Sequence, residues 1–247
     1  MKTTLKAYIP KSIKDILKRL PVRFTQNQRY DHQTKRILNQ VLTNKSNCID
    51  VGCFKGEILD LLIEKAYKGR HFAFEPIPDK FSDLREKYKD QPQVVLHNIA
   101  VSNCKGTSTF NHVVTNPSYS GLKKRDYDLP DERDQQITVD TDMLDSVIPV
   151  DATIDLIKID VEGAEYLVLE GGKALISRCR PITIFEHGLG GSNHYGNGPD
   201  KVFDFFKDCK MNISNLDSYL NKKSPLSKED FCNQYFKKLN YYFVAHP

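Results

Sequence analysis

The sequence lacks any long apolar segment. None of its apolar runs approaches the roughly 18 to 20 residues that are needed to cross a bilayer. Residues 1–20 scatter five Lys and one Arg among apolar residues, without an apolar block or a small-residue cleavage site. We therefore expect neither a membrane span nor a secretory signal.

Paired cysteines and an excess of one charge are also missing. The six cysteines form no Cys-x-x-Cys pair and no Cys/His cluster with the spacing of zinc ligands. Reduced thiols in a cytoplasmic protein are the simplest interpretation. With 36 basic and 32 acidic residues the net charge is +4. This charge is too small and too dispersed to predict nucleic-acid binding, which needs Lys and Arg on one face.

Strands and helices alternate along most of the chain. Short apolar strands are predicted at 47–51, 71–75, 154–160 and 182–186, and a broken strand is predicted over 94–101. Apolar spacing typical of helices occurs at 11–20, 27–43, 58–63, 81–88, 164–176 and 202–209. Repeated βαβ units require a mostly parallel sheet with helices on both faces, so we predict an α/β fold.

The alternation is interrupted once, at about 102–142. There 107–114 and 136–141 look like strands around a polar segment, which we interpret as an insertion. We divide the chain into an N-terminal helical extension (1–45) and one domain (46–247). At the C-terminus, strands at 213–216 and 241–245, separated by a helix at 228–236, are predicted to form an antiparallel pair at the edge of the sheet.

The first strand ends in a motif typical of ligand binding. Asp50 lies at the carboxyl end of the strand, and Gly52 and Gly56 precede the next helix. Ligands of open α/β sheets bind at this edge. Gly52 allows a tight turn and a close approach of ligand to backbone, and Gly56 allows close packing of helix and strand. An acid beside a helix start favours a cationic or zwitterionic ligand. A purely structural turn explains an isolated Asp-x-Gly equally well.

Glu75 favours a nucleoside as that ligand. It ends the second strand, where an acidic side chain can accept both hydroxyls of a ribose. The loop from Gly52 to Gly56 lacks the Gly-x-Gly-x-x-Gly pattern that binds a pyrophosphate. A ligand with a ribose and without phosphates therefore fits better than a dinucleotide.

Further charged residues follow the next two strands. Lys158, Asp160 and Glu162 surround the end of one strand, and Glu186 and His187 end the other. Charges grouped at strand ends are typical of functional sites, and a general base is available among them. A divalent cation with oxygen ligands is compatible with these acids, but no spacing identifies a metal site.

Several segments together resemble the FkbM-type family of S-adenosylmethionine-dependent methyltransferases. The resemblance runs from about Asn47 to His187, and Lys158-Ile-Asp-Val-Glu-Gly163 is its most specific part. The other matching segments are Ile49-Asp-Val-Gly-Cys-Phe-Lys-Gly56, Phe74-Glu-Pro76, Asn98-Ile-Ala100, Ile137-Thr-Val139 and Leu144-Asp145. The resemblance implies a Rossmann-like class I methyltransferase fold, with a seven-stranded sheet whose last strand is antiparallel. It also implies methyl transfer, usually to a hydroxyl oxygen.

The resemblance also assigns expected roles to residues. The cofactor would be bound by Asp50, Gly52, Phe54, Gly56, Glu75, Pro76, Asn98, Ile99, Ala100 and Asp160. Asp160 would lie near the sulfonium or the acceptor, and Glu162, Glu186 and His187 would line the acceptor side. Ser118 and Ser120, in a segment similar to a serine-containing one of the family, would face the acceptor with Lys158. His187 or Asp160 is our hypothesis for the base.

Three other functions stay open at this stage. A non-catalytic domain that binds a partner, an NAD-linked oxidoreductase and an RNA methyltransferase each fit part of the pattern. The expected acceptor, a hydroxyl on a sugar, a glycan or a small polar metabolite, rests on the family resemblance alone. The sequence fixes neither the oligomeric state nor a metal requirement.

Overall fold

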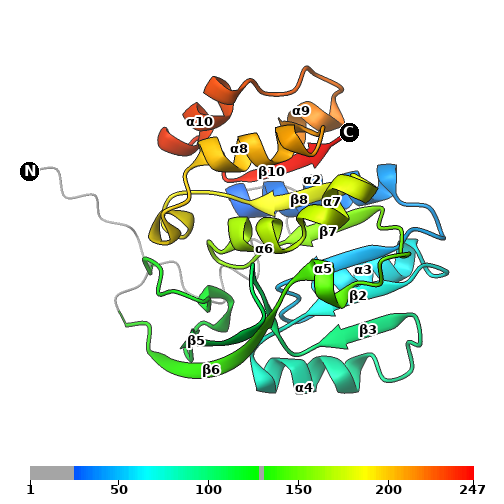
Figure 1. Cartoon of the computed structure of the whole chain (residues 1–247), viewed down its shortest axis with the longest axis vertical. Coiled ribbons are helices and arrows are strands. Elements are labelled where there is room, and N and C mark those ends of the chain that lie inside the picture. Colours follow the sequence, from blue (N-terminus) through cyan, green and yellow to red (C-terminus); the bar gives the residue numbers. More distant parts are fainter. Residues whose placement is uncertain (1–24, 128–130) are drawn as a thin grey trace, which may run out of the picture.

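The computed structural model describes residues 25–127 and 131–247, and a twisted sheet runs through its centre (Figure 1). The helix predicted at 11–20 lies outside the described residues. Of the predicted N-terminal extension, the structure describes α2 (Gln26–Val41). This helix begins with a capping box in which the Thr25 side chain accepts the backbone N–H of Gln28.

The central sheet has seven strands. Their bounds are β1 (Cys48–Val51), β2 (His71–Phe74), β3 (Val94–His97), β7 (Leu156–Ile159), β8 (Ile182–Glu186), β9 (Asn212–Asn215) and β10 (Tyr242–His246). They lie in the order β3-β2-β1-β7-β8-β10-β9. β10 is antiparallel to β8 and β9, and the remaining pairs are parallel. The predicted α/β fold, with its mostly parallel sheet and antiparallel last strand, is confirmed.

Helices cover both faces of this sheet. One face packs against α5 (Leu144–Val147), α6 (Glu165–Gly171), α7 (Lys173–Cys179), α8 (Pro199–Asp208) and α10 (Lys228–Phe236). The other packs against α2, α3 (Glu57–Lys65), α4 (Pro78–Lys87) and α9 (Leu216–Leu220). Strands β1, β2 and β7 are buried along their whole length, which explains why they read as continuous apolar runs.

The register of the strands decides which polar side chains share a face. Asp50 pairs with Lys158, and Glu186 pairs with Tyr242. In their strands these four residues lie two positions from Cys48, Leu156, Ile184 and Val244, which pack toward α2, α3 and α9. Because side chains alternate along a strand, the four polar residues point to that same face.

A second, smaller sheet corresponds to the predicted insertion. It contains β4 (Ala100–Val101), β5 (Gly106–Val113) and β6 (Asp134–Asp142), with β6 in the middle. Figure 1 shows β5 and β6 curving away from the main sheet. The break predicted within the strand over 94–101 separates β3 from β4, and these two strands belong to different sheets. Asn98 lies at the break and donates from its side-chain amide to the carbonyls of Glu75 and Pro76.

The helix predicted at 164–176 is also divided in two. α6 ends at Gly171, and α7 begins at Lys173. A Cβ on Gly171 would lie 2.0 Å from the carbonyl oxygen of Ser102, so the close approach of that chain requires a glycine. The apolar spacing continues across the break, which is why the sequence predicted a single helix.

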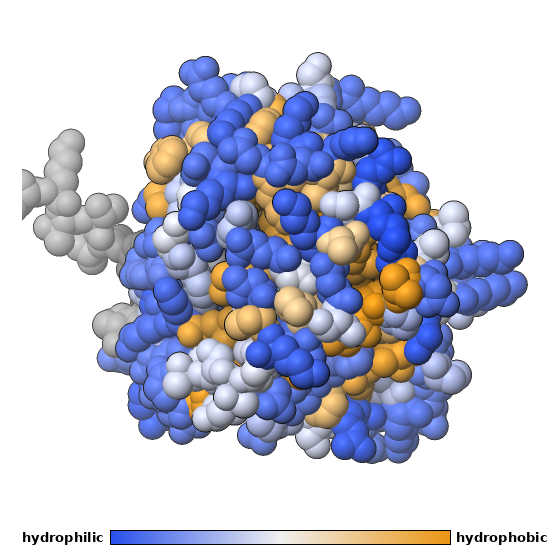
Figure 2. All heavy atoms as spheres, in the orientation of Figure 1, coloured by the Kyte–Doolittle hydropathy of each residue, from blue (hydrophilic) through white to orange (hydrophobic). Residues whose placement is uncertain are grey.

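Among the described residues, no helix has both the length and the apolar character of a membrane span. The face drawn in Figure 2 is mostly hydrophilic, with smaller apolar areas between the polar ones.

Candidate active site

The loop after β1 brings two strand ends into contact. Gly52 has φ +81°, and a Cβ there would lie 1.9 Å from the carbonyl oxygen of Asp160. The N–H groups of Gly52 and Cys53 both donate to the carbonyl of Phe74. Gly52 therefore lets the ends of β1, β2 and β7 come together, as only a residue without a side chain can.

Gly56, which we expected to bring helix and strand together, instead contacts the end of α4. Its φ is +76°, and a Cβ would lie 2.1 Å from the Tyr88 hydroxyl. That hydroxyl donates to the Gly56 carbonyl and to Asp60 of α3. Gly56 thus stabilises the turn into α3 through Tyr88, and it is not among the residues that line a pocket.

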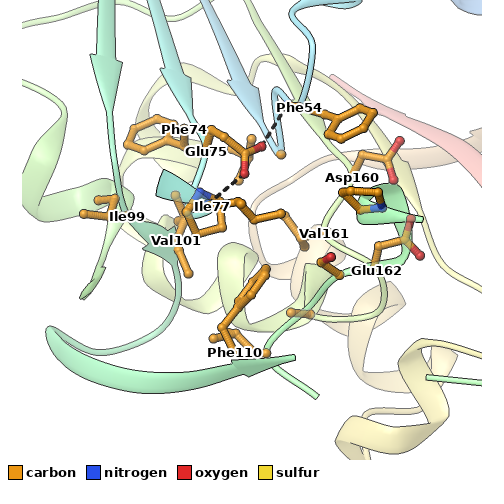
Figure 3. A pocket seen from close by; sticks show the side chains of 18 of the residues that line it. Phe54, Phe74, Glu75, Ile77, Ile99, Val101, Phe110, Asp160, Val161 and Glu162 are labelled. Atoms are coloured by element: carbon orange, nitrogen blue, oxygen red, sulfur yellow. Dashed lines mark hydrogen bonds between the residues drawn. The ribbon is translucent and has the colours of Figure 1, made fainter. Parts of the chain in front are cut away.

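A pocket of about 570 Å³ opens beside this loop at the carboxyl ends of the strands (Figure 3). The lining residues are Val51, Gly52, Phe54, Phe74, Glu75, Pro76, Ile77, Ile99, Ala100, Val101, Phe110, Pro117, Ser118, Ser120, Leu122, Asp160, Val161, Glu162 and Ala164. In Figure 3, apolar side chains such as Ile99, Val101 and Phe110 lie on one side, and the carboxylates of Asp160 and Glu162 lie on the other.

Glu75 is the acid held most firmly in this pocket. Its two carboxylate oxygens each accept one backbone N–H, from Phe54 and from Ile77, both at 2.9 Å. Only 4% of the residue is exposed, and burial raises the pKa of its carboxyl to about 7. Each oxygen keeps a lone pair for a further donor. The carboxylate is therefore pre-oriented to accept two neighbouring hydroxyls.

The residues after β3 divide into two roles. Pro76, Ile99 and Ala100, which the resemblance assigns to the cofactor site, line the pocket. Asn98 does not line it. Its amide donates to the carbonyls of Glu75 and Pro76, at 2.8 and 3.1 Å, and so fixes the segment that carries Glu75.

A second, more polar hollow adjoins the first. Its lining residues are Asp50, Gly52, Cys53, Phe54, Lys55, Glu57, Ile58, Ser118, Lys158, Asp160 and Glu162. Gly52, Phe54, Ser118, Asp160 and Glu162 line both hollows, so the two form one continuous site. Its apolar half can hold a flat ring, and its polar half can hold charged or hydroxylated groups.

Asp160 lies where the two hollows meet, at the centre of a hydrogen-bond cluster. Its Oδ2 accepts from Lys158 Nζ at 2.9 Å and from the Tyr242 hydroxyl, and the carboxyl also bonds to Glu186. Burial alone would raise its pKa, but Lys158 and these donors hold the pKa of Asp160 below its ordinary value.

Glu186 shows the opposite shift. Burial, together with the nearby charges of Asp160 and Glu165, raises the pKa of Glu186 well above its ordinary value. These opposite shifts favour an ionised Asp160 beside a Glu186 carboxyl that holds its proton more readily, with Glu186 as the donor in the bond between them. Glu186 is not among the residues that line the two hollows, so it acts on the site through Asp160.

Asp50 lies deeper in the polar hollow and is 2% exposed. Burial raises the pKa of its carboxyl to about 6. Its Oδ2 has no hydrogen-bond partner among the described residues. A buried acceptor without a partner fits a site that receives a donor or a cation from a ligand.

Glu162 joins the site to the predicted insertion. It forms an ion pair with Arg125, whose guanidinium lies 4.8 Å from the centre of the Tyr119 ring. The segment after Arg125 contacts the loop after β8, where the Asp126 N–H donates to the Gly190 carbonyl. The insertion and this loop thus lie together at the acid-rich end of the site.

The two serines of the insertion differ in their surroundings. Ser118 lines both hollows, and its hydroxyl donates to the Asn116 side chain at 2.7 Å. Ser120 lines the first pocket but is 8% exposed, and its hydroxyl accepts the Val113 N–H at 2.9 Å. Ser118 is therefore the better placed of the two to contact a ligand.

His187 does not join this cluster. It follows Glu186 and points to the opposite face of the sheet, where its ring stacks on Tyr235 at 4.9 Å and on Phe231 at 6.1 Å. Only 1% of it is exposed, it lines neither hollow, and burial lowers its pKa to about 4. The expectation that His187 lines the acceptor side with Glu186 fails, because neighbouring residues of a strand point to opposite faces.

Several site residues escaped the sequence reasoning. Phe110 and Leu122 line the pocket from the predicted insertion, and Val161 lines it from the Lys158–Gly163 segment, but as apolar residues they gave no sign of a role in binding. No sequence pattern indicated that Tyr242 belongs to the site, because its contact with Asp160 depends on the antiparallel register of β10. Among residues 25–127 and 131–247, no group of three or more His, Cys, Asp or Glu side chains is arranged to hold a metal ion.

A Rossmann-like sheet with an acid-anchored pocket at its carboxyl edge is an arrangement in which many α/β proteins bind nucleotides and related ligands. Comparison with known proteins identifies the family. The model of the methyltransferase FkbM domain matches residues 50–213, and the chain belongs to that family. A curated relative, the 2-O-methyltransferase NoeI of Sinorhizobium fredii (strain NBRC 101917 / NGR234), is 28% identical over 151 residues. This match covers 54% of the chain and 60% of NoeI, which is less than two thirds of that protein.

Solved structures resemble the chain more distantly. The methyltransferase FkbM of Methylobacillus flagellatus KT has 16% identity and a TM-score of 0.49, covering 83% of this chain and 44% of that one. The fibrillarin of Aeropyrum pernix, solved with bound S-adenosyl-L-methionine, has 11% identity and a TM-score of 0.44, covering 87% and 73%. With TM-scores below 0.5, these likenesses carry no argument about the activity of this chain.

Proposed function

We propose that the chain transfers the methyl group of S-adenosylmethionine to a hydroxyl oxygen of a sugar, a glycan or a small polar metabolite. The observation that carries the proposal is the position of Glu75. Two backbone N–H groups anchor its carboxylate in a pocket that Asp160 also lines. Membership of the FkbM methyltransferase domain family and the likeness to a 2-O-methyltransferase support the reaction type.

The residues present fit an adenosyl sulfonium compound. Glu75 would accept the ribose hydroxyls, and the adenine would lie against Ile77, Ile99 and Phe110 on the apolar side. The polar hollow, with the unpartnered Oδ2 of Asp50, would receive the amino acid part. When bound, the cofactor supplies an electrophilic methyl group.

On the acceptor side, Asp160 is the proposed base. The new O–C bond forms as the S–C bond breaks, and the hydroxyl proton passes to the Asp160 carboxylate. Its ionised state at neutral pH follows from Lys158 and the donors around it. Much of the acceleration would come from holding the acceptor oxygen in line with the methyl group, and Ser118 and Glu162 are placed to do so.

Calorimetry tests cofactor binding directly. We expect heat of binding with S-adenosylmethionine and S-adenosylhomocysteine and none with NAD, and binding of NAD alone would favour an oxidoreductase. Loss of two hydrogen bonds to a charged acceptor predicts that Glu75→Ala weakens binding by about 10- to 100-fold. Glu86→Ala is the matched control, since Glu86 is an exposed acid on α4. Unchanged affinity in Glu75→Ala would contradict the assigned ribose site.

Transfer of a labelled methyl group tests the reaction. Mono- and oligosaccharides, small hydroxylated metabolites and RNA should be offered with labelled S-adenosylmethionine, and we expect label in a hydroxylated small molecule or glycan. Label in RNA alone would instead make the chain an RNA methyltransferase. Asp160→Asn should abolish turnover and His187→Ala should retain it. The reverse result would move the base to His187.

A further inference from the structure

The last strand of the sheet brings a hydroxyl to the proposed base. Tyr242 lies in β10, outside the residues that the family model matches. The antiparallel pairing of β10 with β8 sets it directly opposite Glu186. Its hydroxyl donates to Oδ2 of Asp160, the oxygen that Lys158 Nζ also contacts at 2.9 Å.

Two neighbouring side chains contact the ring of Tyr242. Lys158 Nζ lies 4.8 Å from the ring centre and 3.3 Å from the hydroxyl. Tyr30 of α2, which is 4% exposed, stacks on the ring with a centroid distance of 5.1 Å. Strand pairing and these two neighbours leave the hydroxyl little freedom, so its direction toward Asp160 is a fixed feature of the fold.

We infer that Tyr242 is a positioning residue, which together with Lys158 holds one oxygen of Asp160 so that the carboxylate stays ionised and its other oxygen faces the acceptor. This inference rests on the proposed function. Burial and the charge of Asp160 raise the pKa of Tyr242 well above its ordinary value, so the phenol stays a donor. A hydrogen bond to the charged form of an acid favours that form.

Other charged groups near Asp160 oppose or support this effect. They include Asp31 of α2, Asp50 of β1, Lys158 of β7, Glu165 of α6 and Glu186 of β8, and the ion pair of Glu162 with Arg125 lies at the same end of the site. Lys158 is the cation that contacts Asp160, and the acids raise the pKa of Asp160 whenever they are ionised. With so many acids nearby, the neutral donor Tyr242 adds a stabilising contact without a further charge.

The test is the Tyr242→Phe variant, which removes the hydroxyl and keeps the ring. Titration of ¹³C-labelled aspartate carboxyls by NMR reports on Asp160, whose signal is assigned with Asp160→Asn. We expect the titration midpoint of Asp160 to rise by about one pH unit in Tyr242→Phe, the size of a lost hydrogen bond to a charged group. Tyr241→Phe is the control, because the Tyr241 hydroxyl bonds to Asn27 and not to Asp160.

Enzyme kinetics give a second reading. In the pH profile of kcat/KM, the apparent pKa of the acid limb should rise together with the titration midpoint of Asp160. The Kd for S-adenosylmethionine should change by less than about threefold. A midpoint of Asp160 that is the same in Tyr242→Phe and the parent overturns the inference, whatever the activity. Absence of methyl transfer in the parent overturns the proposed function instead, and the NMR titration still decides the role of Tyr242.

Discussion

The buried imidazole of His187 should lower the free energy of unfolding in mild acid by a separable amount, and His187→Phe should remove this contribution. Neither ring nitrogen of His187 has a hydrogen-bond partner among the described residues. The ring stacks between Tyr235 and Phe231, so a phenyl ring suits the same space. A neutral, unpartnered ring is tolerated there, but a charged one is not.

The magnitude follows from the two pKa values. Burial lowers the pKa of His187 from 6.5 to about 4, so between these values the unfolded chain binds a proton that the folded chain does not. Stability from this group is therefore complete above pH 6.5, falls as the pH drops and levels off below pH 4. The loss amounts to about 2 kcal/mol at pH 5 and to about 3 kcal/mol at pH 4.

Urea unfolding of the parent and of His187→Phe at pH 7.5 and pH 5.0 measures this effect. The comparison with the parent is necessary, because buried acids give the opposite trend. The pKa values of Asp50, Glu75 and Glu165, raised to between about 6 and about 7, favour the folded state as the pH falls. These acids contribute equally in the two proteins, and any packing strain of the phenyl ring contributes equally at the two pH values, so both cancel in the double difference. We expect His187→Phe to gain about 2 kcal/mol over the parent on going from pH 7.5 to 5.0. Equal pH dependence in both proteins would refute the reasoning.

Three further substitutions test the geometry of the site. Gly52→Ala places a Cβ 1.9 Å from the carbonyl of Asp160 at φ +81°, and we expect urea unfolding to show a loss of at least about 2 kcal/mol. Asn98→Ala removes two hydrogen bonds to the segment of Glu75, so calorimetry should show about tenfold weaker S-adenosylmethionine binding with little change in fold. Arg125→Met removes the ion pair with Glu162 at the acceptor end of the site. We expect it to change KM for the acceptor while the Kd for the cofactor stays the same. A changed Kd for the cofactor in Arg125→Met would contradict the assignment of this ion pair to the acceptor side.

Local patterns predicted most of the fold. The short strands of the main sheet are buried on both faces, so their sequences are continuous apolar runs, and glycine or polar residues mark their ends. The predicted elements are interrupted where a single contact overrides the local pattern. Asn98 ends β3 by bonding to Glu75 and Pro76, and Gly171 ends α6 by its closeness to Ser102. No periodicity within the segment reports such contacts.

The candidate site was predictable where strand ends define it, and less so elsewhere. Glu75, Gly52 and Asp160 follow buried strands, and parallel strands end at the same edge, so their convergence follows from the pattern. Grouping His187 with Glu186 ignored the alternation that the same pattern implies. Tyr242 could not be predicted, because its position depends on β10 entering between β8 and β9 in an antiparallel register.

The position of β10 also explains why the chemistry gathers on one face of the sheet. Asp50, Lys158, Glu186 and Tyr242 come from four neighbouring strands, and the register turns all of them toward the side of α2 and α3. If β10 did not lie beside β8, Tyr242 would not lie opposite Glu186. The antiparallel strand therefore completes the surroundings of Asp160, and the C-terminal segment contributes to the proposed catalytic site as well as to the edge of the fold.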